Sequence, residues 1–154
     1  MQISIRRWGA LGVALVLVAF GTATLAGAAP VVFSSSPFRG WQTNGKVRAV
    51  LTVGTTAYAG GDFTTVRSPD GTQTLARAHL AAWDVRTGQI LPGFAADTNG
   101  NVESLASDGN RLFVGGDYTS IKGVTKTRLA AVDLTSGNVV TSFTANANSH
   151  VYAL

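Results

Sequence analysis

One phrase occurs twice in this chain, and that repetition limits the fold more than any other feature of the sequence. Residues 58–66 read YAGGDFTTV and residues 113–121 read FVGGDYTSI, with the glycines and the aspartate in register. The likeness extends over equal lengths, from TNGKVRAVLTVGTTAYAGGDFTTV at 43–66 to TNGNVESLASDGNRLFVGGDYTSI at 98–121. The sequence therefore predicts two copies of one structural unit.

The likeness continues past this phrase, and a third copy begins near residue 151. The matching segments are HLAAWDVRTGQILPGF at 79–94 and RLAAVDLTSGNVVTSF at 128–143. The connector before them is the main difference, because it is six residues longer at 67–78 than in the second copy. Val47, Val102 and Val151 open the three copies at intervals of 55 and 49 residues, a spacing typical of propellers and other repeat arrays.

Each copy has the pattern of short antiparallel strands. The turn signals are Gly54-Thr55, Gly109-Asn110 and the Asp-x-x-x-Gly segments 84–88 and 133–137. Strands are expected between them at 47–51, 57–59, 80–83 and 89–91, and at 102–106, 112–114, 129–132 and 138–141. The pattern predicts an all-β chain of four-stranded antiparallel β-propeller blades, with two complete repeats and the start of a third, which is an incomplete propeller.

The repeated GGD phrase has a structural explanation. We expect the double glycine to end the second strand of each copy, where the backbone bends and another strand approaches closely. Asp62 and Asp117 are expected to bond the freed amides. Phe63 and Tyr118 are expected to pack between neighbouring blades.

These phrases carry a resemblance to a known family. The pairs YAGGDFTTV with HLAAWD and FVGGDYTSI with RLAAVD resemble the delta-60-type β-propeller repeats of exported bacterial proteins, which are distantly similar to Kelch and tryptophan–aspartate propellers. The resemblance covers residues 43–154 and implies a propeller in a secreted or cell-surface setting, without implying an activity. The longer connector 67–78 departs from the pattern, and we place it as a loop on one face of the disc.

The N-terminus has the pattern of a secretory signal peptide. Arg6 and Arg7 form a positive region, residues 10–20 an apolar region, and Ala26-Gly27-Ala28 a site of small residues, so cleavage is expected after Ala28. The alternative is an uncleaved membrane anchor. Ile5 departs from the twin-arginine export motif, which favours general secretion.

The predicted organisation follows from these patterns. The segments are a signal peptide at 1–28, an N-terminal segment with a candidate closing strand at 29–42, blade 1 at 43–97, blade 2 at 98–146, and the first strand of blade 3 at 147–154. Since a propeller closes with roughly four to eight blades, we expect the remaining blades either in the same chain or through oligomerisation.

Charge and cysteine content narrow the classes of partner. The formal net charge is +4, and two of the positive charges belong to the predicted signal peptide. The remaining basic residues are scattered apart from Lys122, Lys126 and Arg128, so the sequence gives little support to nucleic-acid binding. The chain has no cysteine, so an exported domain would be held together without disulfides.

The polar residues that could carry chemistry are better explained as structural. Asp62 and Asp117 lack the further oxygen ligands that calcium needs, and we expect them to cap turns. Asp84 and Asp133 recur in both copies, which argues against one catalytic site. The two histidines, His79 and His150, are expected in loops or at the rim, without the spacing of a zinc site. We therefore predict no catalytic, cofactor-binding or metal-binding residues and no cofactor.

Two functions from different classes remain. The first is an exported non-catalytic binding or scaffold module, with a protein or carbohydrate held at the disc face; Trp41 is a candidate for stacking on a sugar, whereas Trp83 is expected in the core. The second is the N-terminal part of a propeller enzyme, of quinoprotein or copper-oxidase type, whose catalytic residues lie beyond Leu154. The repeated turns favour the first function.

Overall fold

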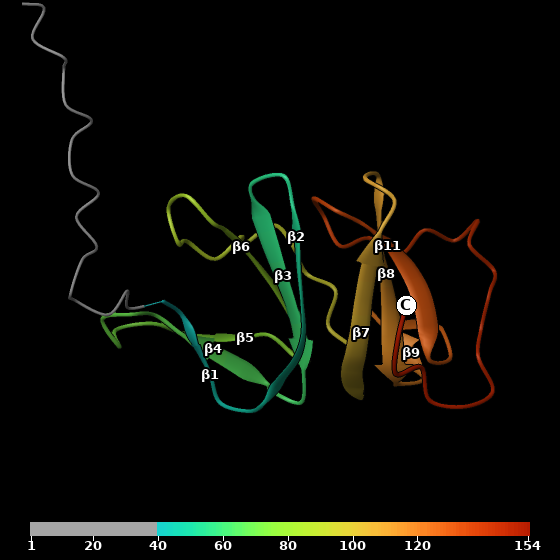
Figure 1. The fold of residues 1–154 in the computed structure, drawn as a ribbon. Coiled ribbons are helices and arrows are strands. Elements are labelled where there is room, and N and C mark those ends of the chain that lie inside the picture. The colour runs from blue at the N-terminus through green and yellow to red at the C-terminus, as the bar shows by residue number, and fades with distance from the viewer. Residues whose placement is uncertain (1–39) are drawn as a thin grey trace, which may run out of the picture. The chain divides into compact units, whose positions relative to one another are not determined.

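The computed structural model describes residues 40–154, so the predicted signal peptide and residues 29–39 lie outside the described residues. Figure 1 shows that the regular structure of residues 40–154 is β, without a helix, as the turn and strand patterns predict. No helix in this part of the chain could therefore cross a membrane. The strands are β1 Gln42–Thr43, β2 Val47–Val53, β3 Thr56–Gly61, β4 Thr65–Arg67, β5 Thr74–Ala76, β6 Leu80–Asp84, β7 Asn101–Ser107, β8 Arg111–Asp117, β9 Ser120–Ile121, β10 Val124–Thr125 and β11 Leu129–Asp133.

Two three-stranded antiparallel sheets have the same strand order. The first sheet is β2-β3-β6 and the second sheet is β7-β8-β11, each with its middle strand second in the chain (Figure 1). Both contain a register shift at the same place, between Val47 and Ala49 in β2 and between Val102 and Ser104 in β7. The equivalent sequences of the two copies therefore pair in equivalent registers.

The predicted fourth strand of each copy is reduced to a single bridge. Ile90 pairs with Trp83, and Val139 pairs with Val132. The chain turns directly afterwards, because the amide of Phe94 donates to Leu91 O at 3.2 Å and the equivalent amide of Phe143 donates to Val140 O at 3.0 Å. The prediction of four-stranded sheets was wrong here. Each turn directs the following backbone away from β6 or β11, so a longer fourth strand cannot pair there.

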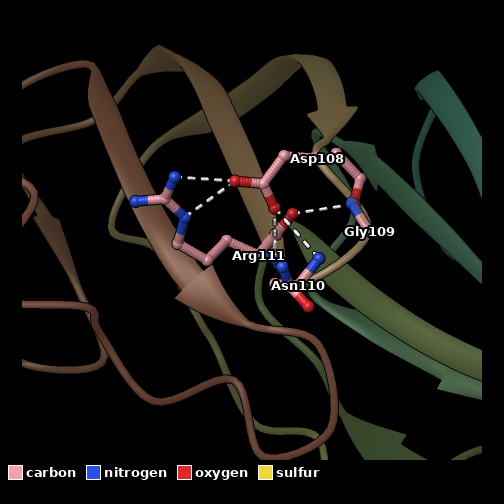
Figure 2. Close-up of polar contacts among 5 residues, drawn as sticks. Asp108, Gly109, Asn110 and Arg111 are labelled. Atoms are coloured by element: carbon pink, nitrogen blue, oxygen red, sulfur yellow. Dashed lines mark hydrogen bonds and ion pairs between the residues drawn. The ribbon is translucent and has the colours of Figure 1, made fainter.

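Both predicted hairpins are present. Gly54-Thr55 joins β2 to β3, and residues 108–110 join β7 to β8. Figure 2 shows how Asp108 holds the second turn: its Oδ1 accepts the amides of Asn110 and Arg111 at 3.0 and 2.8 Å, and its Oδ2 accepts Nε and NH2 of Arg111 at 2.9 and 2.7 Å. Gly109 has a φ of +89°, a conformation that glycine adopts without strain.

The prediction that the double glycine ends the second strand is confirmed in β3, whose last two residues are Gly60 and Gly61, and is wrong in β8, which continues to Asp117. The predicted close approach is nevertheless confirmed. A Cβ on Gly61 would overlap the carbonyl oxygen of Lys46, and one on Gly60 would overlap Cγ1 of Val102. The glycines allow the register shift of β2 on one side and the approach of β7 on the other, so pairing continues through them.

The connector at 67–78 is a hairpin and not the expected plain loop. Its strands β4 and β5 pair with each other, and β1 adds a third strand on the other side of β4. The shorter connector of the second copy forms only the two-stranded β9-β10 ribbon. The six extra residues thus lengthen a hairpin that both copies contain.

Two apolar clusters fill the spaces beside the sheets. The larger, which we call the shared core, takes Tyr58, Leu80 and Phe94 from the first copy and residues such as Val102 and Tyr118 from the second. The smaller cluster contains Phe63, Val66, Ala81 and Ile90, all from the first copy, with Trp41, Leu75 and Trp83 against it. Tyr118 therefore packs between the two sheets as expected, whereas Phe63 packs only against its own copy.

An asparagine in each copy clamps the segment after the GGD phrase, a contact that the sequence patterns did not predict. Asn44 Oδ1 accepts the amides of Thr64 and Thr65 at 2.8 and 2.9 Å. Asn99 Oδ1 accepts the amides of Thr119 and Ser120, both at 2.9 Å. The signal was available in the shared TNG triplet, because asparagine commonly bonds backbone amides at turns.

Candidate functional site

The part of the first copy that differs most from the second forms the candidate site. In the β4–β5 turn, Ser68 N donates to Gln73 O and Gly71 N donates to Ser68 O, both at 2.9 Å. Gly71 closes the turn with a φ of +74°. The Ser68 hydroxyl also accepts the Gln73 amide at 2.9 Å. These bonds hold the six extra residues in a defined shape.

Asp70 is bound within this turn. Its Oδ1 accepts the Ser68 hydroxyl at 2.5 Å and the Thr72 amide at 3.0 Å, and its Oδ2 accepts the Thr72 hydroxyl at 2.9 Å. These donors, the Ser68 hydroxyl first among them, lower the pKa of Asp70 to about 2. The carboxylate is a fixed, ionised acceptor at neutral pH, so the turn presents negative charge without a mobile side chain.

Three shallow hollows, each of about 240 Å³, lie around this hairpin. The one we call the Trp41 hollow is lined by Trp41, Ser68, Pro69, Asp70, Gln73 and Gln89. The other two share Gln42 and Arg67, and they extend along β1 and β4. Aromatic, carboxylate and amide groups therefore meet at one place on the first copy.

The Trp41 ring is positioned by packing. It is half-buried against the smaller cluster, and its Nε1 is buried without a hydrogen-bond partner among the described residues. Trp83 also packs on this cluster and pairs with Ile90, as expected of a core residue. Trp41 is thus the tryptophan that borders a hollow, and Trp83 supports the sheet.

The repeated aspartates bond their own chain. Asp84 Oδ1 accepts the amides of Arg86 and Thr87 at 2.8 and 2.9 Å. Asp133 Oδ1 accepts the equivalent amides of Thr135 and Ser136 at 3.0 and 2.8 Å. The amides of Thr87 and Ser136 are the main cause of the lowered pKa of each carboxyl. The turns predicted at 84–88 and 133–137 are confirmed, and an aspartate caps each of them.

Asp62 and Asp117 differ despite their equivalent positions. Asp62 accepts the Lys46 amide and the Arg48 guanidinium, the second at 3.3 Å, as a turn-capping residue should. Asp117 Oδ1 instead lies 3.5 Å from Arg128 Nε and 3.4 Å from His150 Nε2. The prediction that Asp117 bonds freed amides was therefore wrong, since Arg128 stands where the first copy has His79 and attracts the carboxylate. Among residues 40–154 no group of three or more potential metal ligands occurs.

The histidines lie at different kinds of position. His79 has a φ of +70°, donates its amide to Phe63 O at 2.8 Å, and places Nδ1 3.2 Å from Gly61 O. Arg128, its equivalent, has a φ of +64° and donates its amide to Tyr118 O at 2.9 Å. His150 stacks on Tyr152 beside Asp117. The two histidines are thus placed in separate copies, at the backbone turn before β6 and near the end of β8.

The basic residues of the second copy bind acceptors of their own chain. Lys122 Nζ donates to Asn138 Oδ1 at 2.7 Å and to Ser136 O at 3.3 Å. Lys126, which is buried, donates its Nζ to Phe143 O. Arg128 lies beside Asp117, so each of Lys122, Lys126 and Arg128 contacts an acceptor of its own chain.

The bound aspartates predict a loss of stability in acid. Folded-state pKa values of about 2 for Asp70 and Asp108 lie below the unfolded value of about 3.9, so their stabilisation is complete above that value and disappears as the pH falls toward 2. We expect the thermal midpoint to be steady near neutral pH and to fall between about pH 4 and pH 2. The Asp70→Asn and Asp108→Asn double variant should have a shallower fall, and identical profiles for the two proteins would contradict this explanation.

Comparison with known proteins adds no family to these observations: no protein-family model matches the chain, and no curated protein matches it significantly.

Proposed function

We propose that this chain is an exported, non-catalytic β-propeller-type module of the delta-60 class that binds carbohydrate at the Trp41 hollow. The observation that carries the proposal is the Trp41 hollow itself, which lies beside the β4–β5 hairpin, the element that is longer than its equivalent in the second copy. Loops that differ on a common scaffold are where binding residues concentrate. Asp84 and Asp133, which recur in both copies, hold equivalent turns, whereas Asp70 holds a turn that has no equivalent in the second copy.

The blade part of the proposal is supported by the two equivalent sheets and the core between them. Each sheet has the same strand order and the same register shift, and one apolar cluster joins them. Propeller blades pack face to face, one after another, and this packing requires equivalent sheets with an apolar cluster between them. Export remains a prediction from the first 28 residues.

The chemistry of the Trp41 hollow favours a sugar as its ligand. A half-buried indole offers an apolar surface for the C–H face of a pyranose ring. Asp70 supplies a fixed acceptor, while Gln73 and Gln89 supply amides that both donate and accept. A shallow hollow lined by one aromatic ring and several polar side chains fits one or two exposed residues of a longer glycan better than an enclosed small molecule. A protein partner at the same face is the alternative outcome.

Binding to a glycan array tests this proposal. We expect the purified chain to bind a subset of oligosaccharides, and Trp41→Ala to weaken the tightest of them roughly tenfold, which is about 1.4 kcal/mol. Gln73→Ala should weaken binding less, since it removes only polar contacts.

Thr125→Ala, in the equivalent hairpin of the second copy, is the matched control and should bind like the unmodified chain. The thermal midpoints of all variants establish that they are folded. Equal affinities for Trp41→Ala and Thr125→Ala, or an array without a bound oligosaccharide, would refute carbohydrate binding at this hollow.

A further inference from the structure

The shared core joins opposite faces of the two sheets. In β2, Leu51 packs against this core while the adjacent Val50 does not, because successive residues of a strand point to opposite faces. In β7 the equivalent of Val50 is Leu105, and it does pack against the core. The two sheets thus contact the shared core with opposite faces. The face of the second sheet that packs against the core is equivalent to the face of the first sheet that points away from it.

Three exposed valines, two in β2 and one directly after β6, are the equivalents of residues that lie in or against the shared core in the second copy. Val47, Val50 and Val85 are 43%, 67% and 46% exposed. Their equivalents are Val102, which is fully buried in the shared core, and Leu105 and Leu134, which pack against it. We call this set of three valines the Val50 face. The equivalent face of the second sheet is covered by the first sheet in the shared core, so the Val50 face consists of residues that another sheet can cover.

The second sheet has a complementary face. In the first copy Tyr58 and Phe94 form an edge-to-face pair with centroids 5.3 Å apart, and both rings are buried in the shared core. Their equivalents Phe113 and Phe143 form the same pair at 5.5 Å but are only half-buried. Arg111, which Asp108 holds as Figure 2 shows, also contacts Phe113: its Cζ lies 5.2 Å from the centroid of the Phe113 ring. We call Phe113, Phe143 and the adjoining Gly115 the Phe113 face.

A short segment already occupies part of the Phe113 face. Val151 lies against Gly115 as Val102 lies against Gly60, because an added Cβ at either glycine would meet the valine side chain. Val151 N donates to Gly116 O and Ser104 Oγ donates to Val151 O, both at 3.3 Å. Tyr152 and Leu154 are 72% and 50% exposed, so the segment is held mainly at Val151.

We propose that the Val50 face of one copy of this chain docks on the Phe113 face of a second copy, where β2 displaces the segment around Val151. The shared core shows how the two faces would pack. In it, the equivalents of the Val50 face, from the second copy, pack on the equivalents of the Phe113 face, from the first copy. Such a contact is head to tail, and head-to-tail contacts close into rings when the rotation permits.

This inference rests on the stacking of sheets in the proposed function and not on carbohydrate binding. A failure of association would leave binding at the Trp41 hollow untouched, and a failure of binding would leave association untouched. The two experiments therefore separate the two proposals.

Sedimentation of the full chain and three variants over a range of concentrations is the test. The unmodified chain should show a mass that rises with concentration toward a small multiple of the monomer mass, which is 15.9 kDa with residues 1–28 and lower once they are cleaved. Val50→Glu places a charge on the docking face and should remove the rise. Val151→Asp weakens the competing segment and should bring the rise to at least about tenfold lower concentration. Val124→Glu, at a residue that is 39% exposed in β10, is the matched control and should behave like the unmodified chain.

Three results would overturn the proposal. The first is a constant monomer mass for both the unmodified chain and Val151→Asp. The second is an equal effect of Val50→Glu and Val124→Glu, which would indicate association through another surface. The third is a lower thermal midpoint of Val50→Glu without a change in mass, which would place a segment of the same chain on the Val50 face.

Discussion

Replacing Gly61 by alanine is expected to destabilise the chain strongly, because the added methyl group would meet the backbone of β2 and the residue before it. The new Cβ would overlap Lys46 O and lie 3.0 Å from Lys46 C and 3.1 Å from Val47 Cα. All three atoms are backbone, and the Lys46 carbonyl also accepts the Asp62 amide at 3.0 Å. The strand can move away only by giving up this bond and the register shift of β2. We expect a loss of about 3 kcal/mol, the upper part of the range for overpacked sites.

Urea denaturation of Gly61→Ala and Gly93→Ala measures this effect. Gly93 has no atom within 4 Å of an added Cβ, so the same substitution should change its midpoint little. A loss of about 3 kcal/mol is a large share of the roughly 5–15 kcal/mol by which domains are stable. Equal midpoints for the two variants would mean that β2 relaxes around the added methyl group.

Removing the ring of Tyr58 is the second substitution with a large expected effect. The ring is buried between the sheets against Phe94, and its hydroxyl donates to Leu134 O of the second copy at 2.7 Å. We expect Tyr58→Ala to cost about 3–5 kcal/mol, as for other large aromatic residues removed from a core. Phe113→Ala removes the equivalent, half-buried ring and should cost markedly less.

Tyr58→Phe separates the hydroxyl from the ring. This variant keeps the packing and leaves Leu134 O without its donor, which should cost about 1–3 kcal/mol. Chemical denaturation measures the stabilities of these variants. We expect Tyr58→Ala to be the least stable, Tyr58→Phe to be intermediate, and the unmodified chain to be the most stable. If Phe113→Ala is as damaging as Tyr58→Ala, the two sheets are not joined through the first copy's aromatic pair as described.

Local turn chemistry explains why the strand pattern was predictable. Gly54 and Gly109 adopt the positive φ that their turns need, and Asp84 and Asp133 accept amides from residues up to three positions further on. The sequence around each turn therefore determines it. The all-β class and both hairpins follow from such signals. The shortness of the fourth strands was not predicted, although Pro92-Gly93 in the first copy is a turn signal that could have shown where that strand ends. The equivalent residues of the second copy, Thr141-Ser142, carry no such signal, so the end of its fourth strand depends on where the chain goes next.

Long-range contacts explain what could not be predicted. Asp62 and Asp117 have similar local sequences, yet their partners differ because the residues that the fold brings to them differ. Asp62 meets Arg48, whose equivalent is Glu103, whereas Asp117 meets Arg128, whose equivalent is His79. Trp41 was a candidate for sugar stacking, but only the fold brings it to Ser68 and Asp70. The exposure of Val50 likewise depends on what covers its strand. The periodicity of β2 cannot supply that information.

The shared core has a consequence for how the chain unfolds. Neither sheet buries its own apolar residues alone, so melting the second sheet would expose Tyr58, Leu80 and Phe94 of the first to water. Neighbouring units coupled in this way tend to open together, since each interface term depends on both partners. The smaller cluster, built from the first copy only, carries no such coupling. Amide hydrogen exchange should therefore report one slow, cooperative unit that spans β3, β6, β8 and β11, while the β4–β5 hairpin opens separately and earlier.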